Sequence, residues 1–371
     1  MNRFFHEINR NFGFGCMRLP KCGEEVDHAL FSRMIDRFLD AGFNYFDTAR
    51  GYHSGASETA LRECLVKRYP RDRFILTDKL SGPFFETEAE IRPLFESQLL
   101  SCGVSYFDFY LLHAQSRRNY EKYKECRAYE IVSELKKEGK IRHIGISFHD
   151  TADYLEKILS EQPEIEVVQL QFNYFDYEDE QVQSRKCYEV CCRFGKPVIV
   201  MEPVRGGSLV YLPEKAKEIF RKVGDGSPAS FAIRFAASFD NVALVLSGMS
   251  DLAQAEDNIG FMRDFQPLSE AEREAVKKVS DLFHSVELVG CTGCRYCTDG
   301  CPRHIPIPDL ISCYNRTIQF EGWDGKKRYG RITSETGKAS DCVSCGKCEQ
   351  ICPQKLPIRS TLKKISAVFE E

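Results

Sequence analysis

The segment GFNYFDTARGYH (residues 42–53) joins a short apolar run to a polar stretch. Phe43–Asp47 has the length and the aromatic content of a buried β-strand. Asp47 ends this run and Tyr52 follows five residues later, so two ionisable side chains come at the strand's carboxyl end. The segment therefore predicts a strand that delivers chemically useful groups to one edge of a sheet.

Similar apolar runs recur on both sides of this segment and alternate with longer amphipathic stretches. We expect eight strands, at residues 13–18, 43–47, 74–79, 107–113, 142–147, 167–172, 197–202 and 242–247. Helical patterns, with apolar residues three and four apart, lie between them, as at residues 24–41, 57–69, 121–138, 178–194 and 229–237. Eight strands that alternate with helices predict the α/β class and a (β/α)8 TIM barrel.

The cysteines are unevenly distributed, because eight of the seventeen fall in two groups of equal spacing. Cys-x2-Cys-x2-Cys-x3-Cys-Pro begins at Cys291 and again at Cys342. Two-cluster bacterial ferredoxins use this run to bind [4Fe–4S] clusters, and the fourth cysteine of each run ligates the other cluster. One predicted cluster thus has the ligands Cys291, Cys294, Cys297 and Cys352, and the other has Cys342, Cys345, Cys348 and Cys301. The alternative, two four-cysteine zinc sites, needs neither the third closely spaced cysteine nor the Cys-Pro.

These patterns divide the chain into three parts. A barrel of this kind takes about 250 residues, so we assign residues 1–268 to it. Residues 269–288 open with Ser-x-x-Glu capping chemistry and predict a connecting helix. Residues 289–371 are predicted to form a small, mainly α-helical, ferredoxin-type domain with two clusters.

Composition excludes several classes of partner. The net charge is −4, with both signs interspersed, so we expect no nucleic-acid partner. The longest apolar runs, such as Val242–Leu246, are strand-sized, and the N-terminus does not resemble a signal peptide. We therefore expect no membrane association and a cytoplasmic location, where the remaining cysteines stay reduced.

Four polar residues stand at successive predicted strand ends: Asp47, Tyr52, Lys79 and His113. In a barrel of this type they converge on one mouth. Hydride transfer to a carbonyl group creates negative charge on oxygen, and Tyr52 is the candidate proton donor. We expect the Lys79 ammonium to lower the pKa of this phenol, Asp47 to support Lys79, and His113 to orient the substrate oxygen.

Asp47-Thr-Ala-x-x-Tyr52, the strand-end Lys79 and Leu-Leu-His113 resemble the tetrad motifs of the aldo/keto reductase family. The resemblance extends over most of residues 12–265 and includes Glu-Pro-Val-Arg-Gly-Gly at residues 202–207. It implies a nicotinamide cofactor and a small-molecule carbonyl or alcohol substrate.

The resemblance also implies which residues hold that cofactor. By position, Ser147 and Gln169 contact the carboxamide, and Met201 stands where an aromatic ring commonly stacks on the nicotinamide. The loop after the last strand, with Gly248, Gln254 and Asn258, holds the adenosine phosphate end. This loop lacks a Lys or Arg to pair with a 2′-phosphate, so NADP and NAD both stay open.

The two predicted cofactor types differ in how they carry electrons. A nicotinamide moves two electrons as hydride, each cluster passes one, and we find no flavin signature in the sequence. The clusters are therefore either an electron relay or a structural brace. An alternative is a ferredoxin-linked oxidoreductase, for which a ferredoxin or another carrier is the partner. A further alternative is a redox sensor or electron-transfer subunit with little turnover.

Overall fold

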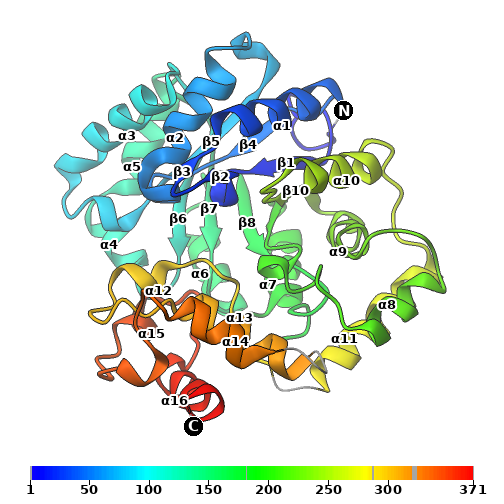
Figure 1. The fold of residues 1–371 in the computed structure, drawn as a ribbon. Helices are drawn as coiled ribbons and strands as arrows, with labels where there is room; N and C mark the ends of the chain where they lie inside the picture. The colour runs from blue at the N-terminus through cyan, green and yellow to red at the C-terminus, as the bar shows by residue number, and fades with distance from the viewer. Residues whose placement is uncertain (1, 181, 286–287, 320–323, 371) are drawn as a thin grey trace. The chain divides into compact units, whose positions relative to one another are not determined.

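The computed structural model describes residues 2–180, 182–285, 288–319 and 324–370. Eight parallel strands close into a barrel in the order β1-β10-β9-β8-β7-β6-β5-β4 (Figure 1). The strands are β1 (Phe12–Gly15), β4 (Tyr45–Asp47), β5 (Ile75–Leu80), β6 (Phe107–Gln115), β7 (Ile141–Phe148), β8 (Val167–Gln171), β9 (Val198–Met201) and β10 (Val242–Ser247). Each of the eight predicted runs overlaps one of them, and the predicted fold class is confirmed.

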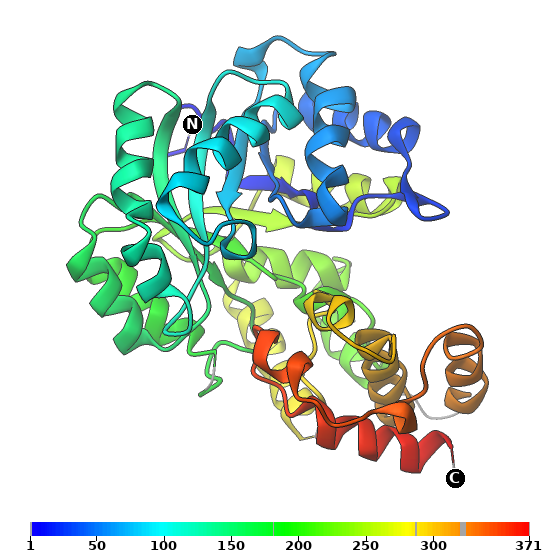
Figure 2. The same cartoon turned by 90° about the vertical axis from the view of Figure 1, so that its left-hand side faces the viewer.

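Helices surround the strands, as Figure 2 shows from a second side. They are α1 (His28–Asp40), α2 (Ala56–Leu61), α3 (Glu88–Cys102), α4 (Tyr120–Glu125), α5 (Ala128–Lys137), α6 (Ala152–Glu161), α7 (Ser184–Arg193), α9 (Pro228–Ala237) and α10 (Leu252–Arg263). Local chemistry sets their ends. Asp27 accepts a hydrogen bond from the Leu30 backbone N–H at 2.9 Å and caps α1, and Thr87 with Glu90 forms a capping box on α3.

Some predicted bounds were wrong. The helix predicted from residue 24 begins at His28, because a short hairpin of β2 (Lys21–Cys22) and β3 (Glu25–Val26) precedes it. The helix predicted over 121–138 is two helices, because Arg127 adopts a left-handed conformation with φ 53° and interrupts the hydrogen-bond ladder. Neither a two-residue strand nor an isolated left-handed residue leaves a periodic apolar pattern.

Strand register brings the predicted catalytic residues to one end of the barrel. Asp47 on β4 pairs with Thr77 on β5, and Lys79 on β5 pairs with Leu111 on β6. All eight strands are parallel, so their carboxyl ends share one rim. Apolar side chains fill the interior behind this rim, among them Tyr45 and Phe109.

The chain forms two compact units. The barrel unit contains Met1–Pro203 and Ala229–Ser269, and the helical unit contains Val204–Pro228 and Glu270–Glu371. The helices of the helical unit are α8 (Glu214–Arg221), α11 (Glu270–His284), α12 (Tyr296–Asp299), α13 (Ile307–Gln319), α14 (Gly325–Ile332), α15 (Lys347–Ile351) and α16 (Ile358–Phe369).

This division differs from the predicted boundaries in two respects. Val204–Pro228, which we predicted to be part of the barrel, belongs to the helical unit, where α8 packs on α11. The predicted connecting helix is α11, which also belongs to that unit, and positions 286 and 287 at its predicted end lie outside the described residues. The domain boundaries stay a prediction.

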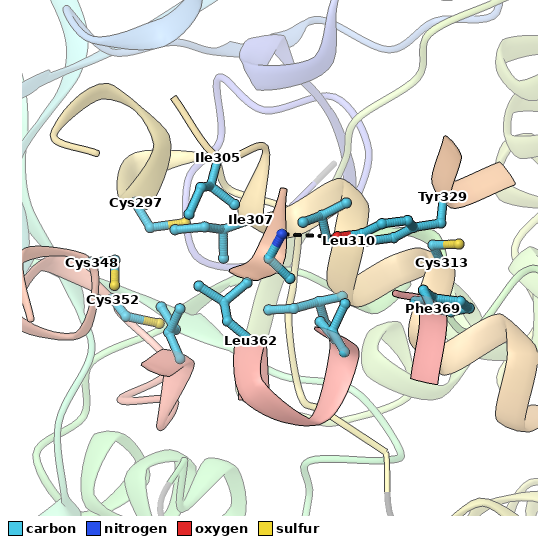
Figure 3. Packing of buried hydrophobic residues seen from close by; sticks show 14 residues of the cluster. Cys297, Ile305, Ile307, Leu310, Cys313, Tyr329, Cys348, Cys352, Leu362 and Phe369 are labelled. Carbon is cyan, nitrogen blue, oxygen red and sulfur yellow. Dashed lines mark hydrogen bonds between the residues drawn. The ribbon is translucent and has the colours of Figure 1, made fainter. Parts of the chain in front are cut away.

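The helical unit has its own apolar core (Figure 3). Leu310 and Leu362 lie at its centre, and the Tyr329 ring stacks on Phe369 with centroids 5.0 Å apart. The Tyr329 hydroxyl accepts a hydrogen bond from the Ala339 backbone N–H at 2.8 Å. Figure 3 also shows three predicted cluster ligands within this core, Cys297, Cys348 and Cys352. Of the helices that the structure describes, none has the length and apolar character that crossing a bilayer requires.

Candidate functional sites

The predicted tetrad comes together at the barrel mouth. Lys79 is fully buried, and its Nζ donates to Asp47 Oδ1 at 2.6 Å and to the Thr48 carbonyl at 2.7 Å. The same Nζ lies 3.5 Å from the Tyr52 hydroxyl and 5.0 Å from the centre of its ring. Two adjacent strands and one turn thus hold an ion pair directly beside a phenol.

The turn after β4 positions Tyr52. The Tyr52 backbone N–H donates to the Ala49 carbonyl at 2.9 Å, and the next two residues, His53 and Ser54, have φ of 51° and 54°. Left-handed backbone at non-glycine residues is uncommon and clusters at functional sites. Here it reverses the chain between Tyr52 and α2.

His113 completes the group from β6. Its ring lies 6.2 Å from the Tyr52 ring, and its Nδ1 is 2.6 Å from Ser81 Oγ. Burial lowers the pKa of His113 well below its usual range, and the positive charge of Lys79 adds to this effect. His113 is therefore a neutral imidazole. When the Ser81 hydroxyl is the donor of the hydrogen bond that it shares with Nδ1, the imidazole proton lies on Nε2.

The protonation of Tyr52 differs from our expectation. Burial raises the pKa of Tyr52 well above its usual value, and the Asp47 carboxylate raises it further, while Arg18 opposes the change. We predicted that Lys79 would lower this pKa, and the direction was wrong. Asp47 pairs with Lys79 at 2.6 Å and offsets its positive charge, so the pair does not outweigh the cost of burying a phenolate.

The residues expected to hold the carboxamide lie on neighbouring strands. Ser147 on β7 and Gln169 on β8 are register partners. Gln169 Nε2 donates to Asp47 Oδ2 at 3.0 Å, and Ser147 Oγ accepts from the Ala114 backbone N–H at 2.7 Å. Met201 ends β9, half-buried, opposite Gln171. A hydroxyl and an amide therefore stand beside the tetrad, and their contacts with a cofactor stay predictions.

The residues expected at the adenosine end gather around the N-terminus of α10. Asn258 Nδ2 donates to Ser247 Oγ at 2.8 Å, and Gln254 Oε1 accepts from the Ser250 backbone N–H at 2.9 Å. Gly248 lies against Arg18, where an added Cβ would be 3.5 Å from the arginine Cβ. A helix N-terminus with a nearby guanidinium is suited to a phosphate group.

Three residues at the mouth were missed by the sequence reasoning: Ser81, Arg18 and Glu202. Arg18 Nη2 pairs with Glu202 Oε1 at 3.2 Å, and the Arg18 carbonyl accepts from Ser250 Oγ at 2.9 Å. The signal that could have identified them is position, because Arg18 and Glu202 each end a predicted strand and Ser81 follows the end of another by two residues.

The eight motif cysteines surround two cavities in the helical unit. One small cavity, which we call site 1, is lined by Cys291, Cys294, Cys297 and Cys352. A second small cavity, site 2, is lined by Cys301, Cys342, Cys345 and Cys348. These are the two crossed ligand sets that the spacing predicts. Ile307 lines both cavities and separates them.

The arrangement of the thiols fits clusters and not single ions. Burial raises the pKa of Cys291 to about 12, and Cys294 and Cys352 are the thiols that raise it further, so Cys352 belongs with the first run. Within the described part of the chain, no three His, Cys, Asp or Glu side chains approach closely enough to hold one metal ion. Four thiols that surround a cavity without approaching to single-ion distance fit a [4Fe–4S] core and argue against the zinc alternative.

Arg205 was also missed, and it lies beside site 1. This residue is buried, and a Cβ added at Gly290 would be 2.7 Å from its Nη2. A Cβ added at Gly206 would be 2.1 Å from the Thr292 carbonyl. Residues 205 and 206 therefore pack against both neighbours of Cys291, where only glycine leaves enough room.

Comparisons with known proteins agree with both halves of this description. Residues 11–281 match the aldo/keto reductase family, and residues 290–357 match the 4Fe-4S dicluster domain. An uncharacterized oxidoreductase of Schizosaccharomyces pombe is 29% identical over 264 residues, which are 68% of this chain and 81% of that protein. An NADH-specific methylglyoxal reductase of Escherichia coli is 28% identical over 195 residues, 47% of this chain and 57% of the reductase.

A solved structure shares the barrel. The holo form of an aldo-keto reductase from Bacillus halodurans superposes with a TM-score of 0.60 at 26% identity, covering 72% of this chain and 91% of that one. The first family match spans most of the chain, and the second falls on the cysteine motifs. This chain therefore belongs to the aldo/keto reductase family of oxidoreductases and carries a 4Fe-4S dicluster domain.

Proposed function

We propose that the barrel catalyses hydride transfer between a nicotinamide cofactor, NAD or NADP, and a small carbonyl or alcohol substrate. Tyr52 is the general acid and base, Lys79 and Asp47 support it, and His113 orients the substrate oxygen. The observation that carries this proposal is the buried ion pair, with Lys79 Nζ 2.6 Å from Asp47 and 3.5 Å from the Tyr52 hydroxyl. We place this chemistry in the cytoplasm.

The protonation states favour carbonyl reduction at neutral pH. A phenol whose pKa is raised keeps its proton and can donate it to a developing alkoxide. As the proton leaves, Lys79 Nζ can move its third N–H onto the phenolate oxygen, because its other two donors already serve Asp47 and the Thr48 carbonyl. The ion pair thus stabilises the product state of the proton transfer more than its ground state.

His113 supplies a second contact to the reacting oxygen. A neutral imidazole with Nδ1 held by Ser81 presents Nε2–H as a donor, and it adds no charge to the site. Two donors, Tyr52 and His113, then define where the carbonyl oxygen lies and which face of the carbonyl carbon is open.

The residues at the mouth fit a nicotinamide dinucleotide. When bound, this cofactor supplies or accepts the hydride. Ser147 and Gln169 offer a hydroxyl and an amide on paired strand positions beside Asp47, and Met201 offers a side chain that can pack on a ring. Gly248, Gln254 and Asn258, at the N-terminus of α10 with Arg18, would hold the phosphates.

Eight thiols around two cavities support two [4Fe–4S] clusters as further cofactors. A relay role is favoured because one side chain, Ile307, separates the two sites, which places them close enough for electrons to pass. This observation also favours the second candidate function, a ferredoxin-linked oxidoreductase. The experiments must distinguish this relay role from two alternatives: clusters that only brace the fold, and a redox sensor with little turnover.

The test is to measure enzyme turnover under anaerobic conditions with defined pairs of a carbonyl substrate and a nicotinamide nucleotide. Methylglyoxal and NADH are the first pair, because one relative is named for that activity, followed by other aldehydes and ketones with NADH or NADPH. We expect nucleotide oxidation that matches carbonyl loss one to one. Cluster bleaching by substrate, with no turnover of either nucleotide, would establish the ferredoxin-linked function instead.

The pH profile tests the role of Tyr52. Because its pKa is raised, the phenol stays protonated at neutral pH, and carbonyl reduction should be flat from about pH 6 to 9. Alcohol oxidation needs the phenolate, so its rate should rise with pH over the same range. A reduction rate that falls steeply above pH 7 would contradict the assignment.

A further inference from the structure

The two cysteine sites differ in the charge of their surroundings. Three cations line site 2: Arg303, Lys347 and Arg359. The described residues that line site 1 besides its cysteines are neutral, including Thr292 and Gln354. One cation, Arg205, lies beside that site, but it is buried. Two sites with the same ligands therefore stand in different electrostatic environments.

They also differ in exposure. At site 2, Cys345 is exposed, and so are Arg303 and Lys347. Val343 lines the cavity with 51% of its surface accessible, so an apolar side chain is exposed beside these cations. At site 1, two of the four cysteines are buried and the other two are half-buried.

Two of the three cations that line site 2 are available to a partner. Arg359 pairs with Glu349 at 2.8 Å, and Asp341, the nearby carboxylate before Cys342, accepts from the Lys338 backbone N–H at 2.7 Å. Over the part of the chain that the structure describes, Arg303 and Lys347 have no carboxylate within ion-pair distance. Two cations thus remain uncompensated beside an exposed thiol.

The sequence shows the same asymmetry on a larger scale. The whole chain has 51 Lys and Arg against 55 Asp and Glu. Residues 289–371 reverse this balance, with 13 Lys and Arg against 9 Asp and Glu. A negatively charged protein is therefore repelled by most of this chain and attracted to its cluster domain.

We infer that the surface around site 2, formed by Arg303, Val343 and Lys347, is the docking site for an acidic one-electron carrier protein of the ferredoxin type. This inference rests on the proposed relay function and extends it by naming the surface at which electrons enter the protein. A small apolar contact with a basic rim fits a partner that must bind, exchange one electron and leave.

The exchange itself is simple to balance. One electron passes between the reduced carrier and the cluster at site 2, so the carrier is oxidised by one electron and the cluster is reduced by one. No proton or group moves in this step. Two encounters place one electron on each of the two clusters, which together hold as many electrons as one hydride carries.

The experiment is anaerobic stopped-flow mixing of the holoprotein with a reduced, acidic plant-type [2Fe–2S] ferredoxin, followed by cluster bleaching. We compare the wild type with the double variant Arg303→Glu/Lys347→Glu. The matched control is Lys326→Glu/Lys327→Glu, the same charge change at exposed residues of α14 that line neither site. Methyl viologen radical cation, a small reductant, reports whether the clusters are intact and reducible in each protein.

We expect the wild-type rate constant to fall as salt rises, and the site 2 variant to be slower by about tenfold or more at low salt and insensitive to salt. The control should stay within about twofold of the wild type. Equal rates for the site 2 variant and the wild type with ferredoxin, while viologen reduces both, would overturn the docking surface alone.

Two other outcomes also decide the question. Wild-type clusters that neither ferredoxin nor viologen reduces would overturn the relay and the docking surface together. Salt-sensitive self-association of the holoprotein in sedimentation, lost in the site 2 variant, would assign the surface to a second copy of this chain and overturn the carrier.

Discussion

The barrel mouth and the cysteine sites both gather reactive side chains, but they hold them in opposite ways. At the barrel mouth the groups bond to one another: Lys79 and Gln169 both donate to Asp47, and Ser81 is 2.6 Å from His113. At sites 1 and 2, four cysteines line each cavity, and none of them is in a disulfide. Protein hydrogen bonds alone hold the catalytic groups of the barrel in place, whereas the cysteine sites are suited to an inorganic core that binds all four thiols.

The largest expected effect is the loss of a cluster. Cys294→Ala removes a ligand from site 1, so we expect the protein to lose about four of about eight irons per chain. Amides of α12 and α15 should then exchange faster with deuterium, while strands of the barrel keep their protection. Iron analysis with hydrogen exchange measures both effects.

The control is Cys313→Ala. This cysteine is buried in the same core, where its thiol donates to the Gly325 carbonyl, but it lines neither site. It should keep full iron. If Cys294→Ala keeps all its iron, or if the barrel loses protection together with the helical unit, the contrast between the two regions is wrong.

The next effect concerns the barrel alone. Tyr52→Phe removes the proposed proton donor and should lower carbonyl turnover by about 10²- to 10⁴-fold, with iron content and nucleotide affinity unchanged. Steady-state kinetics and a fluorescence titration with nucleotide measure these quantities. Tyr45→Phe, a phenol buried in the barrel core two residues before Asp47, is the control and should keep most of the activity. Wild-type turnover in Tyr52→Phe would remove Tyr52 from the mechanism.

The same contrast explains what the sequence could predict. Strand ends and cysteine spacing are local patterns, so the eight strands, the proximity of Asp47, Tyr52, Lys79 and His113, and the two ligand sets were all accessible from it. The pKa of Tyr52 was not, because its direction depends on burial and on Asp47 neutralising Lys79. A sequence shows which charges a site contains, but not how completely they cancel.

Val204–Pro228 shows a second limit. It lies between a barrel strand and a barrel helix, so its place in the chain indicates the barrel. Its contacts place it in the helical unit, with Gly206 against Thr292 and α8 on α11. Contacts between segments that lie far apart in the sequence leave no periodic pattern, and short-range reasoning therefore missed Arg205 as well.

A smaller effect, on the reduction potentials of the clusters, should distinguish site 1 from site 2. Arg205→Gln removes a positive charge beside Cys291, which disfavours adding an electron to a cluster there. We expect the reduction potential of that cluster to fall by about 60 mV if the interaction is worth about 1.4 kcal/mol. Potentiometric titration followed by EPR should show the second cluster unchanged. Arg303→Gln, at site 2, is the matched control and should shift the other potential. Equal shifts of both clusters in either variant would contradict the local assignment.

The smallest expected effect tests how far polar interactions within the barrel contribute to its stability. At the amino-terminal end of the strands, His143 Nε2 is 2.5 Å from Glu7 and Nδ1 is 3.0 Å from Glu166. Burial lowers the pKa of His143, but the two carboxylates outweigh it and the net pKa is raised. This contribution to stability is therefore complete below about pH 6.5, the unfolded value, and is lost as pH rises through the higher folded value.

We expect His143 to stabilise the folded barrel measurably at pH 6. The difference in unfolding free energy between wild type and His143→Gln, taken from exchange of β6 and β7 amides in the holoprotein, should shrink between pH 6 and pH 9. Exchange in α12 and α15 should show no such dependence on His143, because their stability is expected to follow iron. If the difference in unfolding free energy grows with pH, His143 is neutral in the folded barrel. If amide exchange in α12 shows the same dependence on His143, the two units do not unfold separately.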